Sequence, residues 1–351
     1  MSLLLLLLLA FFSCGPGQGD SGPKPLGFGH CKKEAFSKPI PADYKFAYRL
    51  DAPDQTFLMQ PNLQEISGVS VTSDSKYLLA VQDEAGILYV IDKATGKVRE
   101  EVAFGKEGDY EGVESVGNDV YLLRSSGSMK LIKNLDQSNQ EIISIKSPLD
   151  KSYDVEGIGL DAKNNRLLLA CKGSGSTNAL YDNQRAIYAF DLKINQLDTT
   201  PVFCITLASI QGFLKDNPTI EKIDKLQEIF NQAKFDFGPS GLAIEPQTGN
   251  IYLLSARGNT ILVLSPEGQI LHLERLKNKI HSQPEGICFD ANGALYISNE
   301  GKDGIPGTIH YFLKKWSEAV VFAAKPIGFK YLIFRKLDVF DKLRPSCFFL
   351  I

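Results

Sequence analysis

Three glutamates occupy the same position in an internal repeat. Each stands directly before a glycine, in the pairs Glu111 and Gly112, Glu156 and Gly157, and Glu285 and Gly286. Two further copies of the repeat carry a serine there, Ser67 and Ser240. Carboxylates that converge on one place repel one another, and they are relieved by taking up protons or by binding a cation. These residue types at this spacing therefore indicate a cation site.

Calcium is the cation that such a site would hold. It accepts six to eight oxygen ligands in a loose geometry, so Ser67, Ser240, backbone carbonyls and water could complete a shell begun by the glutamates. A possible outer ring of acceptors follows the second strand of two repeats: Asp83, Asn299 and Glu300. Lys172 and Arg257 hold equivalent positions in two other repeats, and their charges could instead neutralise the acids without a metal.

Two other interpretations of the glutamates remain open. A Glu-Gly pair can simply be a turn that enters a strand, with the glutamate facing water. The acids could also be catalytic, as in a calcium-dependent hydrolase in which a metal-bound water attacks an ester or phosphoester. Nucleophilic catalysis has little support, because no GxSxG motif occurs. None of the four histidines shares the repeat position: His30, His272, His281 and His310.

The repeat itself predicts the fold. Its glycines are Gly68, Gly112, Gly157, Gly241 and Gly286, spaced by 44, 45, 84 and 45 residues. Each is followed by two or three short apolar runs such as IYLLS and TILVLS. A period near 45 residues with three or four strands is typical of a propeller blade. We therefore predict an all-β, five-bladed β-propeller over residues 44–312.

Two departures from the period need elements of their own. The long interval contains 217–235, in which apolar residues recur at helical spacing, so we predict a helical insert there. The fifth repeat supplies only three strands and ends near 308–312. The apolar run at 44–50 is a spare strand, and we expect it to pair with 308–312 and close the ring.

The order of these motifs resembles the SdiA-regulated family of bacterial envelope proteins. The resemblance rests on EISGVSV (65–71), DYEGVES (109–115), DVEGIGL (154–160) and QPEGICF (283–289), and it covers about residues 44–312. It implies a five-bladed propeller distantly similar to NHL-repeat proteins, and a bound calcium ion. It leaves the biochemical function open.

The N-terminus predicts export. Residues 1–13 form an apolar stretch that is too short to span a bilayer and reads as a signal peptide. FFSC followed by Gly15 resembles a lipobox, so we expect a lipid on Cys14 and a flexible tether over 14–43. The alternative is an ordinary cleaved signal peptide with a free Cys14. The predicted location is the bacterial cell envelope, with the chain attached to a membrane by its lipid.

Charge and cysteine content exclude several classes. The net charge of −3 provides no positive field for nucleic acid. Residues 313–351 are rich in basic and aromatic residues and do not follow the repeat. They could form a surface helix that contacts lipid, or they could come from a fused reading frame. The five cysteines after Cys14 include no CxxC pair, so we predict neither a zinc site nor a disulfide framework.

Together these features predict a lipid-anchored envelope propeller with a calcium site in its channel. We expect it to act as a binding module for an unknown protein or small-molecule ligand. The alternative is a calcium-dependent hydrolase, either an esterase or lactonase or a phytase-like phosphatase.

Overall fold

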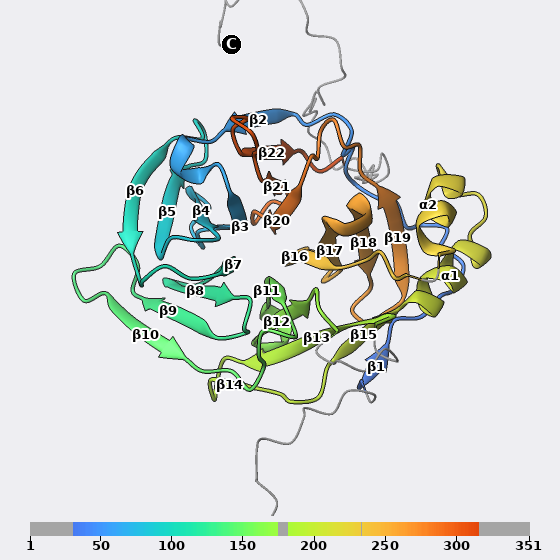
Figure 1. The fold of residues 1–351 in the computed structure, drawn as a ribbon, viewed down its shortest axis with the longest axis horizontal. Helices are drawn as coiled ribbons and strands as arrows, with labels where there is room; N and C mark the ends of the chain where they lie inside the picture. The colour runs from blue at the N-terminus through green and yellow to red at the C-terminus, as the bar shows by residue number, and fades with distance from the viewer. Residues whose placement is uncertain (1–30, 175–181, 233, 316–351) are drawn as a thin grey trace, which may run out of the picture. The chain divides into compact units, whose positions relative to one another are not determined.

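Five sheets surround a central axis in the computed structural model, which describes residues 31–174, 182–232 and 234–315 (Figure 1). The predicted all-β, five-bladed propeller is thereby confirmed. The signal peptide 1–13, Cys14, the tether up to residue 30 and the tail from residue 316 lie outside the described residues.

Each blade places its strands in order from the axis outwards. The first contains β3 (Ile66–Val71), β4 (Tyr77–Gln82), β5 (Ile87–Asp92) and β6 (Val98–Ala103). The second contains β7 (Tyr110–Val116), β8 (Asp119–Arg124), β9 (Met129–Lys133) and β10 (Glu141–Ile145). The third contains β11 (Val155–Asp161), β12 (Arg166–Cys171), β13 (Gln184–Asp191), β15 (Phe203–Thr206) and β1 (Lys33–Glu34) in this order, and β14 (Gln196–Leu197) pairs with β13 off this path. The fourth contains β16 (Pro239–Ile244), β17 (Ile251–Ser255), β18 (Thr260–Leu264) and β19 (Ile270–Arg275). The fifth contains β20 (Pro284–Phe289), β21 (Leu295–Asn299), β22 (Thr308–Phe312) and β2 (Gln55–Leu58).

The innermost strands are β3, β7, β11, β16 and β20, and they run side by side around the axis (Figure 1). Each packs against the inner strands of both neighbouring blades, and the contact of β20 with β3 completes the ring. Five clusters of buried apolar side chains fill the spaces between successive blades. The core is therefore divided among the blade interfaces, which hold the inner strands in position.

The prediction that residues 44–50 form the closing strand is wrong. The fourth strand of the last blade is β2, whose residues Gln55–Leu58 pair antiparallel with β22 from Leu58 and Thr308 to Gln55 and Tyr311. Residues 44–50 form no strand and instead pack Tyr48 and Leu50 against the core shared by the fourth and fifth blades. The apolar residues in 44–50 are therefore explained by burial in the core and not by pairing in a sheet.

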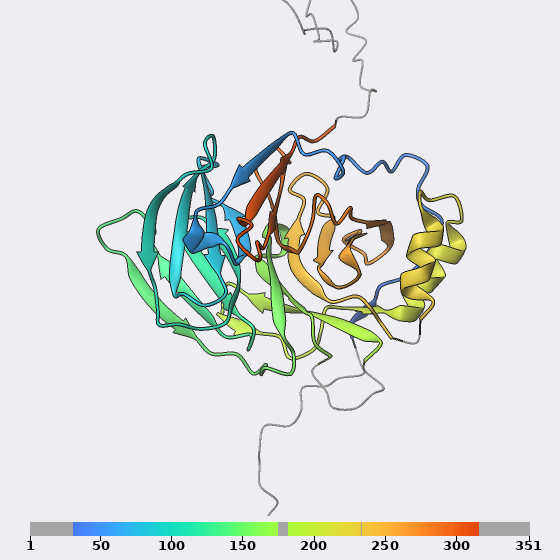
Figure 2. The same cartoon turned by 45° about the horizontal axis from the view of Figure 1, so that its top comes forward.

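The helical insert exists, but it is two helices with different bounds from the predicted 217–235. Helix α1 spans Leu207–Asp216 and α2 spans Ile223–Phe230. Thr206 caps α1 through a capping box with Ser209. Asn217 follows α1, and Pro218 cannot continue a helix because it lacks the N–H group. The pair covers the outer side of the fourth blade (Figures 1 and 2).

A disulfide joins Cys31 to Cys204, which corrects the prediction that the cysteines form no such bridge. It ties the start of the described chain to β15, against which β1 pairs in parallel. Among the described cysteines, Cys171 and Cys288 are free and buried. No helix in the described part of the chain is long and apolar enough to cross a membrane.

Candidate functional site

A β-bulge lies at the repeat position in all five inner strands. In β7, Tyr110 pairs with Arg124 and Gly112 with Leu123, so that Glu111 is the extra residue. Glu156 and Ser240 are the extra residues in β11 and β16, and the register shifts at the same place in β3 and β20. A bulge interrupts the strand's regular alternation and redirects one side chain. This is why the residue before each glycine is set apart in every blade.

The repeat glycines are required by the close approach of neighbouring inner strands. A Cβ atom built on Gly68 would lie 2.6 Å from the Cα of Gly112, and one on Gly286 would lie 2.5 Å from the carbonyl oxygen of Ser67. Both distances are too short for a carbon atom. Inside this ring of glycines only about 10 Å³ of cavity remains, bordered by Glu111, Glu156 and Ser240 among others. The channel is therefore almost closed at this level.

The three glutamates form one electrostatic group. Burial, followed by repulsion from Glu156, raises the pKa of Glu111 well above its usual range. Burial also raises the pKa of Glu156, where Lys172 opposes the shift and Glu285 adds to it. The pKa of Glu285 is raised from 4.5 to about 7, again mainly by burial. Repulsion from Glu300 and Asp83 adds to the raised pKa of Glu285.

Lys172 is the nearest described cation. Its Nζ lies 2.7 Å from Oε1 of Glu156. The other oxygen, Oε2 of Glu156, is buried and has no hydrogen-bond partner among the described residues. The ion pair therefore satisfies half of a carboxylate that is only 5% exposed. A buried carboxylate oxygen without a partner is costly, and it is the atom that a cation or an ordered water would contact.

The predicted outer ring divides into two groups. Asp83 and Glu300 lie with the acids, because burial and then Glu65 raise the pKa of Asp83, and burial and then Asp83 raise that of Glu300. The two serines have structural partners instead. The hydroxyl of Ser240 donates to the carbonyl of Pro284 at 2.7 Å, and the carbonyl of Ser67 accepts from Ser298 at 2.7 Å.

Asn299 is almost fully buried, and its two side-chain polar atoms have no hydrogen-bond partner within the described chain. Across the described ranges, no three His, Cys, Asp or Glu side chains are close enough to hold a metal ion directly as they stand. Direct coordination would therefore need a change of side-chain rotamer, or water between the carboxylates and the ion.

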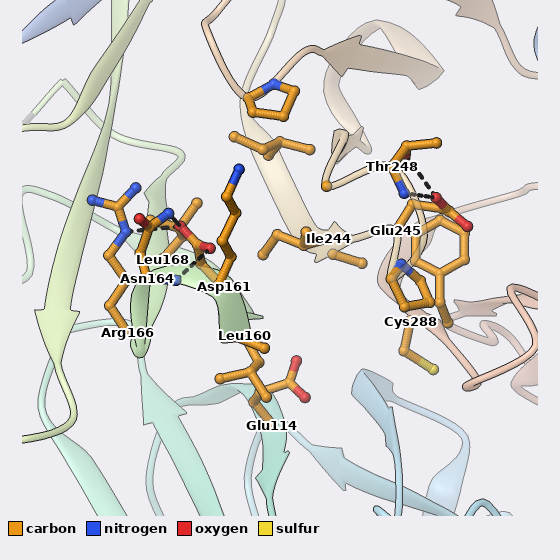
Figure 3. A pocket seen from close by; sticks show the side chains of 18 of the residues that line it. Glu114, Leu160, Asp161, Asn164, Arg166, Leu168, Ile244, Glu245, Thr248 and Cys288 are labelled. Atoms are coloured by element: carbon orange, nitrogen blue, oxygen red, sulfur yellow. Dashed lines mark hydrogen bonds and ion pairs between the residues drawn. The ribbon is translucent and has the colours of Figure 1, made fainter.

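A larger cavity, which was not predicted from the sequence, lies at the other ends of the inner strands. It has a volume of about 760 Å³ and is lined by the last residues of β3, β7, β11, β16 and β20 and by the turns that follow them (Figure 3). Glu114 of β7 is half-buried and belongs to this lining. The signal in the sequence was Glu114 itself, a second acid in an inner strand that also carries Glu111.

Comparison with known proteins identifies a family. The family model described as SdiA-regulated matches residues 44–302. The comparison with curated proteins finds no significant sequence match.

Several solved structures are similar. The glutaminyl cyclase of Myxococcus xanthus shares 10% identity, with 75% of this chain and 96% of that chain covered and a TM-score of 0.48. A protein of unknown function from Bacteroides thetaiotaomicron shares 12% identity, with coverages of 71% and 56% and a TM-score of 0.42. The virginiamycin B lyase of Staphylococcus aureus shares 14% identity, with coverages of 70% and 67% and a TM-score of 0.38. At these identities the likenesses concern the fold alone.

The family match covers most of the chain and includes all five repeat glycines and the three glutamates. The chain belongs to the SdiA-regulated family.

Proposed function

We propose that this propeller binds one calcium ion at the acidic mouth of its channel and works as a lipid-anchored binding module of the bacterial envelope. The observation that carries the proposal is the shared bulge, which sets Glu111 and Glu156 apart at the same level of neighbouring inner strands. Glu285 follows at the corresponding register shift of β20. Burial raises the pKa of each of these carboxyl groups, and a divalent cation would relieve the cost of ionising them.

The donor set suits calcium better than a softer metal. Carboxylate, carbonyl and water oxygens are its usual ligands, and its loose geometry tolerates an incomplete protein shell. Glu156 offers the unpartnered Oε2, while Asp83 and Glu300 add negative charge nearby. Lys172 would have to share or release Glu156 when the ion binds. Glu111, Glu156 and Glu285 would hold the ion, in part through water.

Export is supported by the bridge between Cys31 and Cys204. Disulfides form and persist in oxidising compartments such as the periplasm and are rare in the cytosol. This agrees with a signal peptide at 1–13 and a lipid on Cys14. We propose that the lipid holds the protein at a membrane while the propeller presents its two open ends to ligands.

Calcium-dependent thermal unfolding tests the ion site. In the wild type, calcium at a hundredfold excess over its Kd should stabilise the fold by about 2.7 kcal/mol relative to chelator. Glu285→Gln should lose most of that gain, and in chelator at pH 8 it should be somewhat more stable than the wild type because it lacks the buried charge. Glu141→Gln, which changes an exposed acid on β10, is the matched control and should respond like the wild type.

A wild type that ignores calcium would overturn the ion site. A parallel assay with chromogenic carboxylic and phosphoric esters separates the two functional classes. Calcium-dependent turnover that disappears in Glu285→Gln would replace the binding module with the hydrolase.

A further inference from the structure

The cavity at the far end of the channel is a separate compartment from the acidic mouth. The three glutamates lie near the starts of their inner strands. The last residues of all five inner strands line the cavity instead. Between the two, the glycine ring leaves only about 10 Å³. The cavity's volume of about 760 Å³ lies in the range that encloses a small organic ligand.

The walls of the cavity are partly apolar. Three apolar residues of the inner strands β11, β16 and β20 are only half-buried: Leu160, Ile244 and Phe289. Elsewhere in these strands the apolar side chains are fully buried. These three remain accessible because they face the cavity, and they would cover the apolar body of a ligand.

Glu114 differs from the other acids around the cavity, apart from Glu267, which is exposed to solvent. Asp161 pairs with Arg166 at 2.8 Å, and Glu245 pairs with Lys314 at 2.7 Å. Asp290 pairs with Lys93 at 3.0 Å.

Glu114 has no such ion pair within the described ranges. Its Oε1 accepts from the hydroxyl of Ser70 at 3.1 Å and from the backbone N–H of Ser115 at 3.0 Å. Figure 3 shows its carboxyl group turned towards the open centre, between Leu160 and Cys288.

We propose that this cavity binds a small organic cation, a primary amine or guanidinium on an apolar body, with its charged group on Glu114. The two donors from Ser70 and Ser115 hold the carboxylate in one orientation, which reduces the cost of ordering it on binding. Burial raises the pKa of Glu114 to about 7, so a bound cation would favour its ionised form. The cations on this side are occupied or exposed, because Arg166 binds Asp161 and Lys163 lies at the solvent-exposed rim.

The test compares three probes that share one apolar body: phenethylamine, phenethyl alcohol and hydrocinnamate. Calorimetry on the whole protein in chelator makes the result independent of the proposed calcium site. Phenethylamine should bind most tightly and hydrocinnamate least. Glu114→Gln keeps the side chain's shape and should weaken phenethylamine about ten- to hundredfold, because a hydrogen bond to a charged group is lost.

Two further variants complete the design. Glu141→Gln removes an exposed acid on β10, away from the cavity lining, and should leave the affinity unchanged. Lys163→Glu should increase the affinity for phenethylamine about twofold at low salt. Because this substitution is on the surface, it tests the proposal even if Glu114→Gln fails to fold. Equal binding of the three probes, absence of phenethylamine binding, or affinities that ignore both Glu114→Gln and Lys163→Glu would overturn the proposal.

Discussion

Replacing Gly286 with alanine tests the claim that the repeat glycines set the spacing of the inner strands. The new Cβ atom would lie 2.5 Å from the carbonyl oxygen of Ser67 and 2.7 Å from the amide nitrogen of Val69. Both belong to β3 of the neighbouring blade, and backbone atoms cannot rotate away as a side chain can. The two inner strands would therefore have to separate.

The size of the effect follows from these contacts. Overpacking a well-packed interior costs about 1–3 kcal/mol, and a clash with backbone belongs at the upper end. The new Cβ atom would also crowd the hydroxyl of Ser298. Displacing that hydroxyl weakens the bond from Ser298 Oγ to Ser67 O at 2.7 Å and the bond from Gly286 N to Ser298 Oγ at 2.8 Å. At roughly 1 kcal/mol for each bond, the total is about 3–5 kcal/mol. At about 2 °C per kcal/mol, the melting temperature should fall by roughly 6–10 °C.

Gly212→Ala is the matched control. Gly212 lies inside α1, and its new Cβ atom would have only Ser37 nearby, at an ordinary 3.5 Å. Alanine is preferred to glycine in a helix by about 1 kcal/mol, so this variant should be slightly more stable than the wild type. Thermal and urea unfolding of both variants provide the measurement. A Gly286→Ala protein as stable as the wild type, or two variants destabilised equally, would refute the reasoning.

Three further predictions concern pH, redox state and the membrane. In chelator, the free energy of unfolding should fall as pH rises from about 4.5 through 7, because the folded state holds the proton of Glu285 more tightly than the unfolded chain does. Roughly 1–3 kcal/mol is lost for this carboxyl, and urea unfolding at pH 5 and 8 would show no such loss if the acid were solvated. Reducing the bridge between Cys31 and Cys204, which are 173 residues apart, should lower the free energy of unfolding by no more than about 5 kcal/mol. The double serine variant should not respond to reductant. A wild type that melts identically with and without reductant contradicts this prediction. Cys14→Ser should move the protein from the membrane to the soluble fraction, and continued sedimentation with membranes would assign the anchor to another segment.

The blades were predictable because their cause is local and repeated. Each repeat glycine is needed at the same level of the channel. In each strand, successive apolar side chains alternate between the two interfaces that its blade makes with its neighbours. Non-local pairing was harder to infer. The closing strand Gln55–Leu58 has three exposed residues out of four and carries little apolar signal, whereas 44–50 has the stronger pattern without being a strand.

The candidate site divides in the same way. Glu111, Glu156 and Glu285 were predicted to converge because a repeat position in a propeller is also a position around the axis. The bulge that sets them apart depends on strand register and leaves no mark beyond the Glu-Gly pair. The cavity around Glu114 arises where five strand ends meet, and the disulfide joins residues 173 apart, so neither follows from a local pattern.

Equilibrium dialysis against radioactive calcium tests the central claim most directly. The wild type should take up one ion per chain, and the control Glu141→Gln should match it. The double variant Glu156→Gln with Glu285→Gln should take up almost none at the same free calcium, since two of the three converging carboxylates are gone. No uptake by the wild type, or equal uptake by the double variant, would contradict a calcium site among these glutamates.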